Sequence, residues 1–279
     1  MKCNAKKEDA LFMKKFEINE YIITTEKFKN NFSGYKFAVI SDLHSNVYKV
    51  DLDAVYDAVC DAGVDAVLLC GDIFNGKPVD DIAETMAFVK KLADKLAVFM
   101  AFGNHEYRLA MNPDIYGDKI WQIIDALEEN GVVILSDETI ILEKDNEQLA
   151  LSGLEIDTIF YKRRPPVMGE GLVKMHLGDA KEDVFHLLMA HNPRYFQNYA
   201  QWGADLVLSG HVHGGTVRLF GKKGVIGTDF RLFPKYCGGM YEEFGSKMIV
   251  SRGLGTHTIK VRIGNRPELI MVKILAKEQ

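Results

Sequence analysis

Short apolar runs alternate with segments of helical periodicity along the first half of the chain. The runs Phe37–Ile40, Ala66–Cys70 and Ala97–Ala101 each end in a polar cluster, a pattern typical of buried strands followed by loops. Between the first two runs, apolar residues repeat at helical spacing from Leu52 to Gly63, and glycine often ends a helix. Since strand, helix and strand alternate, we expect a parallel, layered α/β core.

The second half of the chain has shorter β-type runs joined by turn residues. Val132–Leu135, Thr139–Leu142 and Leu149–Leu151 predict antiparallel or mixed sheet. Further strands are expected at Val184–Ala190, Asp205–Ser209, Thr216–Phe220, Lys247–Ser251 and Leu269–Ile274. This pattern favours an α/β fold in which two mixed sheets pack face to face with helices outside, a four-layer α/β/β/α sandwich. We expect a main domain over residues 35–279 and an N-terminal segment, residues 1–34, that carries an edge strand.

Histidine, aspartate and asparagine gather in the loops that directly follow these strands. In open α/β sheets, the loops at the carboxyl ends of strands converge on a ligand, so the clusters are expected to share one site. Five of the eight histidines lie in these clusters, which is more than core packing explains. The clusters are Asp42-Leu43-His44, Gly71-Asp72, Gly103-Asn104-His105-Glu106, Ala190-His191-Asn192-Pro193 and Gly210-His211-Val212-His213-Gly214-Gly215.

The donor atoms in these clusters predict a class of metal ion. Imidazole together with carboxylate suits manganese, iron, cobalt or zinc, whereas oxygen donors alone favour magnesium or calcium. Alternate residues after a strand point the same way, so Asp42 and His44 are expected to hold one ion. The same spacing places His211 and His213 close enough to serve two neighbouring ions. The two oxygens of Asp72 can bridge cations about 3.5 to 4 Å apart.

The charge and the cysteine content of the chain indicate which binding partners and which cellular location to expect. The net charge is -5, without a basic cluster dense enough to follow a nucleic-acid backbone, so nucleic acid is not the expected partner. The four cysteines include no Cys-x-x-Cys pair, which fits a reduced, cytoplasmic setting. Neither a signal peptide nor a transmembrane segment is expected from the apolar pattern. A peripheral membrane contact near Leu11–Met13 stays open.

Taken in order, these clusters resemble the motifs of the calcineurin-like metallophosphoesterases, over a region from about Tyr35 to Leu275. The segments Ala190–Pro193, Gly210–Gly215 and Ser251–Thr256 resemble, more narrowly, the bacterial phosphodiesterase branch that includes YaeI and YkuE. The resemblance implies a metallophosphoesterase fold with two divalent or trivalent metal ions, namely manganese, iron or zinc. It also implies hydrolysis of a small-molecule or lipid-linked phosphate ester, most of all a phosphodiester.

The resemblance further implies a role for each residue. Of seven implied metal ligands, the first ion would be held by Asp42, His44 and His213, the second by Asn104, His191 and His211, and both by Asp72. His105 is then the catalytic residue, a general acid that acts on the leaving oxygen while a metal-bridging hydroxide attacks phosphorus. Two positions depart from the family pattern, since Asn75 stands where Asp is common and Thr216 where Gln is common. Neither is an implied ligand, so substrate contacts are expected to differ more than metal binding.

Alternatives stay open at the level of sequence. The same site could serve a phosphomonoesterase, or the fold could be a non-catalytic scaffold, although a scaffold would be expected to have lost ligands. The basic segment Lys162–Pro166, with Tyr161, fits a phosphate contact or a solvated loop. Glu106 and Asn192 either orient neighbouring ligands or are solvated. Structural roles are expected for the remaining histidines, His176, His186 and His257.

Overall fold

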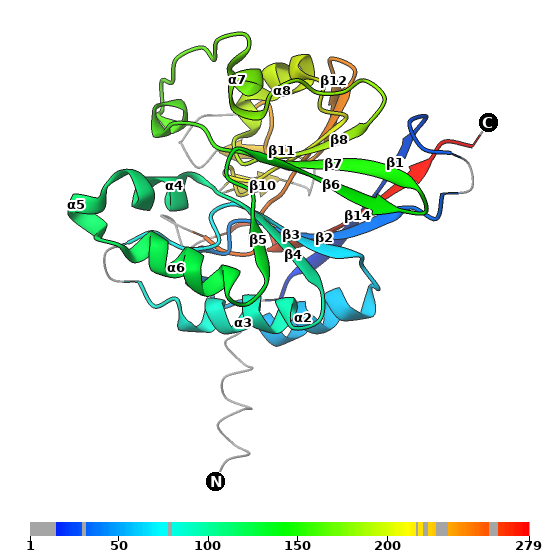
Figure 1. The fold of residues 1–279 in the computed structure, drawn as a ribbon. Helices are drawn as coiled ribbons and strands as arrows, with labels where there is room; N and C mark the ends of the chain where they lie inside the picture. The colour runs from blue at the N-terminus through cyan, green and yellow to red at the C-terminus, as the bar shows by residue number, and fades with distance from the viewer. Residues whose placement is uncertain are drawn as a thin grey trace.

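The computed structural model describes residues 15–29, 32–77, 80–215, 217–219, 223–226, 234–256 and 262–278. The expectations for Leu11–Met13, Thr216 and His257 lie outside these residues. In the described part of the chain, two six-stranded sheets lie face to face, with helices on both outer faces (Figure 1). The predicted four-layer α/β/β/α sandwich of two mixed sheets is therefore confirmed.

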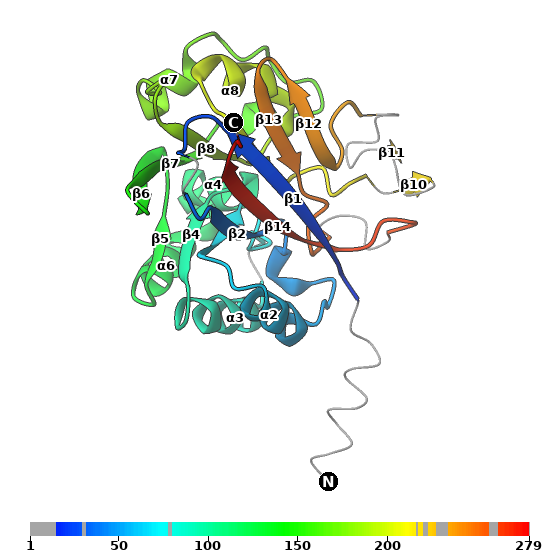
Figure 2. The same ribbon diagram turned by 90° about the vertical axis from the view of Figure 1, so that its right-hand side faces the viewer.

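The first sheet has the strand order β1-β14-β2-β3-β4-β5. Its strands are β1 (Glu17–Thr25), β14 (Glu268–Ala276), β2 (Tyr35–Ile40), β3 (Ala66–Cys70), β4 (Ala97–Ala101) and β5 (Val132–Ile134). Strands β2 to β5 run parallel, β14 is antiparallel to β2, and β1 is an edge strand parallel to β14. Figure 2 shows β1 and β14 running beside each other along one side of the molecule. The outer face is covered by α2 (Leu52–Asp61), α3 (Ala83–Ala93) and α6 (Lys119–Glu128), as Figure 1 shows.

The second sheet has the order β12-β13-β9-β8-β7-β6. Its strands are β12 (Gly239–Glu243), β13 (Ser246–Val250), β9 (Leu206–Ser209), β8 (Phe185–Ala190), β7 (Glu147–Leu154) and β6 (Glu138–Lys144). The four inner strands are parallel and the two edge strands are antiparallel to their neighbours. Helices α7 (Leu172–Leu177) and α8 (Phe196–Trp202) lie on its outer face (Figure 1). A separate two-stranded ribbon joins β10 (Val217–Leu219) and β11 (Lys223–Ile226).

Alternation along the strands divides the apolar core into layers. In β2, Phe37 and Val39 belong to the core between the two sheets, whereas Ala38 and Ile40 pack with the helices of the first sheet. In β8, likewise, Leu187 belongs to the core between the sheets, and Leu188 packs with the helices of the second sheet. Because successive side chains of a strand point to opposite faces, an apolar run becomes a strand buried on both sides.

The helix predicted from Leu52 is present as α2, whereas another helix begins at a polar cluster that was expected to be a loop. The side chain of Asp51 accepts a hydrogen bond from Ala54 N at 3.0 Å, which caps α2 and satisfies a backbone donor of its first turn. The cluster Gly103–Glu106 was expected to form a turn, but α4 (Asn104–Met111) begins inside it and α5 (Pro113–Tyr116) follows. That prediction was wrong because the polar residues occupy the first turn of a helix, where polar side chains are common. Among the described residues, no helix has the length and apolar character needed to cross a bilayer.

The remaining short helices are 3-10 turns in loops that follow strands. They are η1 (His44–Asn46) after β2, η2 (Thr158–Tyr161) after β7 and η3 (Pro193–Tyr195) after β8.

The three β-type runs that begin at Val132 are divided between the two sheets, since β5 joins the first sheet and the hairpin of β6 and β7 joins the second. The chain therefore crosses from one sheet to the other between β5 and β6.

Candidate metal centre

Loops from both sheets are fastened to one another at the carboxyl ends of their strands. Asp42 N, after β2, donates to Gly71 O, after β3, at 3.0 Å. In the second sheet, Gly210 N, after β9, donates to the carbonyl of His191, after β8, at 3.1 Å. Gly255 N donates to Asp42 O at 2.7 Å and closes a third loop over the first. The polar clusters found in the sequence are thus brought to one place, as the strand-end rule leads us to expect.

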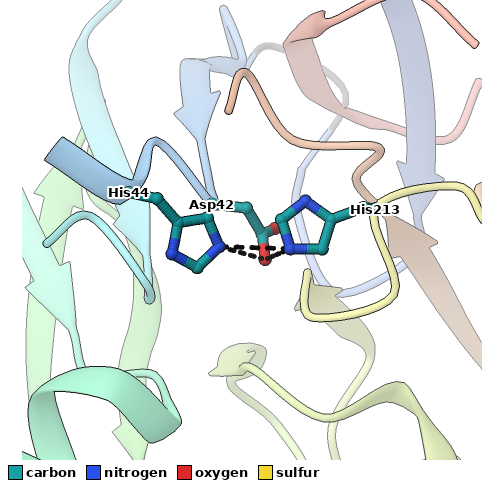
Figure 3. A group of neighbouring side chains, drawn as sticks. All are labelled: Asp42, His44 and His213. Atoms are coloured by element: carbon teal, nitrogen blue, oxygen red, sulfur yellow. Dashed lines mark hydrogen bonds and ion pairs between the residues drawn. The ribbon is translucent and has the colours of Figure 1, made fainter. Parts of the chain in front are cut away.

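A first donor group contains Asp42, His44 and His213, and all three side chains are buried (Figure 3). Asp42 Oδ1 lies 3.4 Å from His213 Nε2 and 4.0 Å from His44 Nε2. The two Nε2 atoms are 3.1 Å apart. One donor atom from each residue lies within 4.8 Å of the others, so a single cation fits among all three.

A second donor group contains Asp72, His191 and His211. His191 Nε2 lies 3.1 Å from Asp72 Oδ2 and 3.7 Å from Asp42 Oδ1, so this imidazole reaches carboxylates of both groups. Asp72 Oδ2 lies 4.0 Å from His44 Nε2, which belongs to the first group. The two groups are therefore adjacent, with Asp72 between them. His211 and His213, two residues apart in one loop, fall into different groups.

Asn104 and His105 open α4 beside these groups, and His105 forms a third, overlapping donor group with His44 and Asp72. His105 N donates to Asp72 Oδ1 at 2.8 Å, and His105 Nε2 lies 3.9 Å from Asp72 Oδ2. Asn104 Oδ1 is shielded from solvent and has no hydrogen-bond partner among the described residues. An unsatisfied buried acceptor is rare in a folded protein and marks a position where a cation or a donor fits. This orphaned oxygen, together with the imidazoles and carboxylates, matches the donor set of a divalent metal centre.

Hydrogen bonds to backbone carbonyls fix the orientation of two histidines. His191 Nδ1 lies 2.8 Å from Cys70 O, and His213 Nδ1 lies 3.3 Å from Gly255 O. Because a carbonyl oxygen only accepts, each Nδ1 carries the proton and each Nε2 is directed to the carboxylates. Metal-binding histidines typically donate their other ring N–H in this way.

The imidazoles of the second group have opposite electrostatic environments. Burial disfavours a proton on His191, but the carboxylates of Asp72 and Asp42 outweigh burial and raise its pKa to about 10. Burial and the neighbouring His191 lower the pKa of His211 to about 3. Burial also lowers the pKa of His213, against the charge of Asp42. Although burial opposes its charge, Asp72 has a pKa well below the usual range because His191 and other imidazoles surround it. The site therefore favours positive charge next to the carboxylates.

Glu106 is fully buried, so the alternative that it is solvated was wrong. Its carboxylate accepts hydrogen bonds from Asp72 N, Phe74 N and Gly103 N, each at 2.9 Å. These bonds tie the loop after β3 to the start of α4 and thereby fix Asp72. Asn192 is buried as well, and its side chain bonds the backbone of neighbouring loops. Glu106 therefore supports Asp72 directly, whereas Asn192 fastens the loop after β8, and neither residue faces water.

Five of the site residues have a left-handed backbone, which residues other than glycine rarely adopt. The φ angles are 52° for Asp42, 49° for His44, 53° for Asp72, 69° for His211 and 48° for His213. Such conformations cost on the order of 1 to 3 kcal/mol each and persist only where the surrounding structure holds them. Strain concentrated at these positions is typical of a functional site, and the spacing of polar residues gives no sign of it.

Glycine allows the close approach of these loops at two points. A Cβ atom on Gly103 would collide with Asp72 Oδ1, and one on Gly210 would collide with Ser41 Oγ and Asp42 Oδ2. Both glycines therefore stand where backbone packs directly against a site carboxylate.

The basic loop after β7 borders the second donor group. The ring of Tyr161 meets that of His211 edge to face, with centroids 4.9 Å apart, and lies 6.3 Å from the ring of His191. Beyond it, the segment Lys162–Arg164 is exposed. Tyr161 thus forms one wall of the site, while the basic side chains lie outside it.

Other polar residues divide between structural roles and contacts that no motif marks. His176 Nδ1 lies 2.6 Å from Asp137 Oδ2, and His186 Nε2 accepts from Lys181 N at 3.0 Å, away from both donor groups. Ser45 and Asp80 hydrogen-bond at 2.6 Å close to His105, a contact between loops 35 residues apart in sequence. The sequence contained no signal for this contact because a lone serine and a lone aspartate are common surface residues.

Comparison with known proteins agrees with this geometry. The calcineurin-like phosphoesterase family model matches residues 35–215. An uncharacterized metallophosphoesterase of Aquifex aeolicus is 29% identical, and the alignment covers 93% of this chain and 92% of that protein. The uncharacterized metallophosphoesterase YkoQ of Bacillus subtilis is 24% identical over 84% of this chain and 82% of its own. The phosphodiesterase YaeI of Escherichia coli is 26% identical over 89% of this chain and 85% of its own.

The fold, the clustered donors and the family match define a metal-dependent phosphoric ester hydrolase. The chain belongs to the calcineurin-like phosphoesterase family, as the resemblance of its motifs predicted. Its similarity to YaeI and to YkuE of Bacillus subtilis, which is 22% identical over 91% of this chain and 83% of its own, also supports the predicted bacterial branch.

Proposed function

We propose that this protein is a phosphodiesterase that uses a dinuclear metal centre, with His105 as general acid. The observation that carries the proposal is the adjacency of two donor groups around one carboxylate, that of Asp72, with only His211 of the second group partly exposed. A single structural metal would need only one such group. Two groups side by side suit an in-line displacement at phosphorus, in which both the attacking and the leaving oxygen need stabilisation.

The donor groups divide the proposed ligands between two ions. The first ion is assigned Asp42, His44 and His213, the second Asn104, His191 and His211, and Asp72 is shared. Mixed nitrogen and oxygen donors favour manganese, iron or zinc. When bound, such ions supply a water of lowered pKa and positive charge next to the phosphate. Glu106 holds Asp72 in position through three backbone hydrogen bonds to the surrounding loops.

In this proposal, His105 transfers a proton to the leaving oxygen. Its Nδ1 donates to the backbone carbonyl of Asn75, and its Nε2 lies 3.9 Å from Asp72 Oδ2. The ring is thus anchored through one nitrogen while the other faces the reacting region. A well-placed general acid contributes about a hundredfold to ten-thousandfold to the rate.

A diester substrate is favoured over a monoester by the similarity to a protein named phosphodiesterase. A phosphomonoesterase is the alternative that uses the same residues. A non-catalytic scaffold is disfavoured because the residues of both donor groups and His105 are present and lie together.

The test is hydrolysis of bis-p-nitrophenyl phosphate and p-nitrophenyl phosphate by metal-stripped protein, before and after manganese is added. We expect activity only with metal, a higher kcat/KM for the diester, and no restoration in Asp72→Asn. Faster monoester hydrolysis would instead establish a phosphomonoesterase. Inactivity toward both esters with two bound ions would contradict catalysis and favour the scaffold.

A further inference from the structure

The imidazole of His105 is held at Nδ1 by a backbone carbonyl, with the guanidinium of Arg108 3.4 Å from the same nitrogen. Its Nδ1 donates to the backbone carbonyl of Asn75, whereas Asn75 Oδ1 has no hydrogen-bond partner among the described residues. A carbonyl oxygen is placed by its loop, not by the identity of its own side chain. The groups that hold the loop at Asn75 therefore determine where His105 points.

The carboxylate of Asp80 holds that loop through the backbone N–H of Asn75. Asn75 N donates to Ser45 Oγ at 2.9 Å and to Asp80 Oδ2 at 3.2 Å. Ser45 Oγ in turn donates to Asp80 Oδ2 at 2.6 Å, a short bond of the kind that a charged acceptor makes. Ser45 and Asn75 are buried, so water does not replace these bonds readily.

The backbone of Ser45 also ties this residue to the loop after β3. Ser45 has a φ of 53°, a left-handed conformation that needs support from its surroundings. Its N–H donates to Ile73 O at 2.8 Å, so Ser45 bonds the loop after β3 through both its backbone and its side chain. On the other side of the turn, Arg108 Nη2 donates to Gly76 O at 2.9 Å. The turn that carries the Asn75 carbonyl is therefore held between Asp80 and Arg108.

We propose that Asp80 is a positioning residue for catalysis, which acts through Ser45 and the backbone of Asn75 to aim the His105 imidazole at the leaving oxygen. The inference rests on the proposed role of His105 as general acid. Asp80 touches neither substrate nor metal ligand in this scheme. Displacing a proton donor by as little as about 1 Å lowers turnover by up to about a hundredfold, so a distant carboxylate can have a measurable effect.

If Asp80 positions His105, its replacement is expected to lower kcat by an amount that depends on the leaving group. A poor leaving group needs protonation as its bond to phosphorus breaks, whereas p-nitrophenolate leaves without help. Asp80→Ala is expected to lower kcat about tenfold to a hundredfold for methyl phenyl phosphate and less than about threefold for methyl p-nitrophenyl phosphate. KM and the number of bound manganese ions are expected to stay unchanged. Asp80→Asn, which keeps an acceptor oxygen, is expected to recover most of the loss.

The matched control is Asp53→Ala, which removes an exposed aspartate that pairs with Lys91 at 2.7 Å. It is expected to leave both rates unchanged. His105→Ala shows the full effect of losing the acid and is compared in the same assay. If His105→Ala is selective for the poor leaving group and Asp80→Ala is not, only the role of Asp80 is overturned. If neither is selective, the general-acid role of His105 fails and the inference fails with it.

A readout independent of turnover is the proton NMR signal of the His105 ring in zinc-loaded protein. A ring N–H held against the Asn75 carbonyl exchanges slowly and gives a resolved resonance, assigned by its absence in His105→Gln. We expect Asp80→Ala to broaden or shift this resonance and Asp53→Ala to keep it. An unchanged resonance in Asp80→Ala would show that Asp80 does not hold the ring and would overturn the proposal.

Discussion

The two donor groups are built from the same residue types, yet they differ in enclosure, and the second holds two histidines with opposite pKa shifts. The first, with His213, is closed over by the loop at Gly255, whose N–H donates to Asp42 O and whose carbonyl lies against His213 Nδ1. The second, with His211, is bordered by the ring of Tyr161 and is less completely enclosed. The first group is therefore sealed from solvent, whereas the second is partly exposed at His211.

The opposite pKa shifts of His191 and His211 have a direct physical consequence. In the second group, the carboxylates of Asp72 and Asp42 raise the pKa of His191 to about 10, while burial and His191 lower that of His211 to about 3. A cation bound in this group would compete with the proton that the carboxylates favour on His191, whereas burial disfavours a proton on His211. Loading of the second group is therefore coupled to protonation through a single residue.

The largest effect is expected from Asp72→Asn, because this change weakens both groups at once. The variant loses the charge that lies between His191 and His44 and is expected to bind less than one ion per chain. Its turnover should fall by on the order of a thousandfold or more, since neither ion is then held in place. Metal analysis after gel filtration and the kcat for bis-p-nitrophenyl phosphate measure the two effects. Two retained ions would show that Asp72 is not shared.

The next-largest effects are expected from two variants that each weaken only one donor group. His211→Ala and His213→Ala lie two residues apart, but each removes a donor from a different group. Each variant is expected to fall from two bound ions to one and to lose about a hundredfold or more in kcat. Electron paramagnetic resonance of manganese-loaded protein should show a coupled pair in the wild type and an isolated ion in both variants. Loss of both ions from either variant would contradict the division into two groups.

Most of the residues that the structure brings together here were predicted from the sequence, because donor residues that follow apolar strands can be recognised from the hydropathy pattern. The clusters at Asp42 and Asp72 could be placed at strand ends since Phe37–Ile40 and Ala66–Cys70 are unmistakable apolar runs. The sequence also predicted that His211 and His213 serve different ions, and the structure has them in different donor groups. The left-handed backbone at both residues was not predicted, because such conformations are held by tertiary contacts.

The start of α4 and the contact of Ser45 with Asp80 were beyond prediction for different reasons. Asn104 begins a helix whose first turn is polar, so its residues resemble a loop in hydropathy. Ser45 and Asp80 meet only because two loops fold together. The local sequence pattern thus predicts helices, strands and the polar residues at strand ends. The contacts that hold those residues in position can be found only in the folded structure.

A smaller effect is expected in the pH dependence of stability of the metal-free protein. Because the pKa of His191 is raised from 6.5 to about 10, its proton stabilises the fold fully below about pH 6.5, and this contribution is lost as the pH rises through 10. The melting temperature of the wild type should therefore fall over that range by several degrees more than that of His191→Gln. His211→Gln is the control and should follow the wild type, since His211 is neutral throughout. Parallel curves for all three proteins would contradict the charge difference between the two histidines.

The smallest effect is expected at Tyr161, which distinguishes the open side of the second group from the closed first group. Tyr161→Phe keeps the ring edge-on to His211 and should change affinity for the second ion less than about twofold. Tyr161→Ala removes that wall and should weaken the second ion about tenfold, in the range seen when groups that support metal ligands are lost, while the first ion is unaffected. Titration of the singly loaded protein with manganese measures this affinity directly. Equal weakening of both ions by Tyr161→Ala would mean that the two groups share one enclosure, because only a common wall transmits the loss of one ring to both.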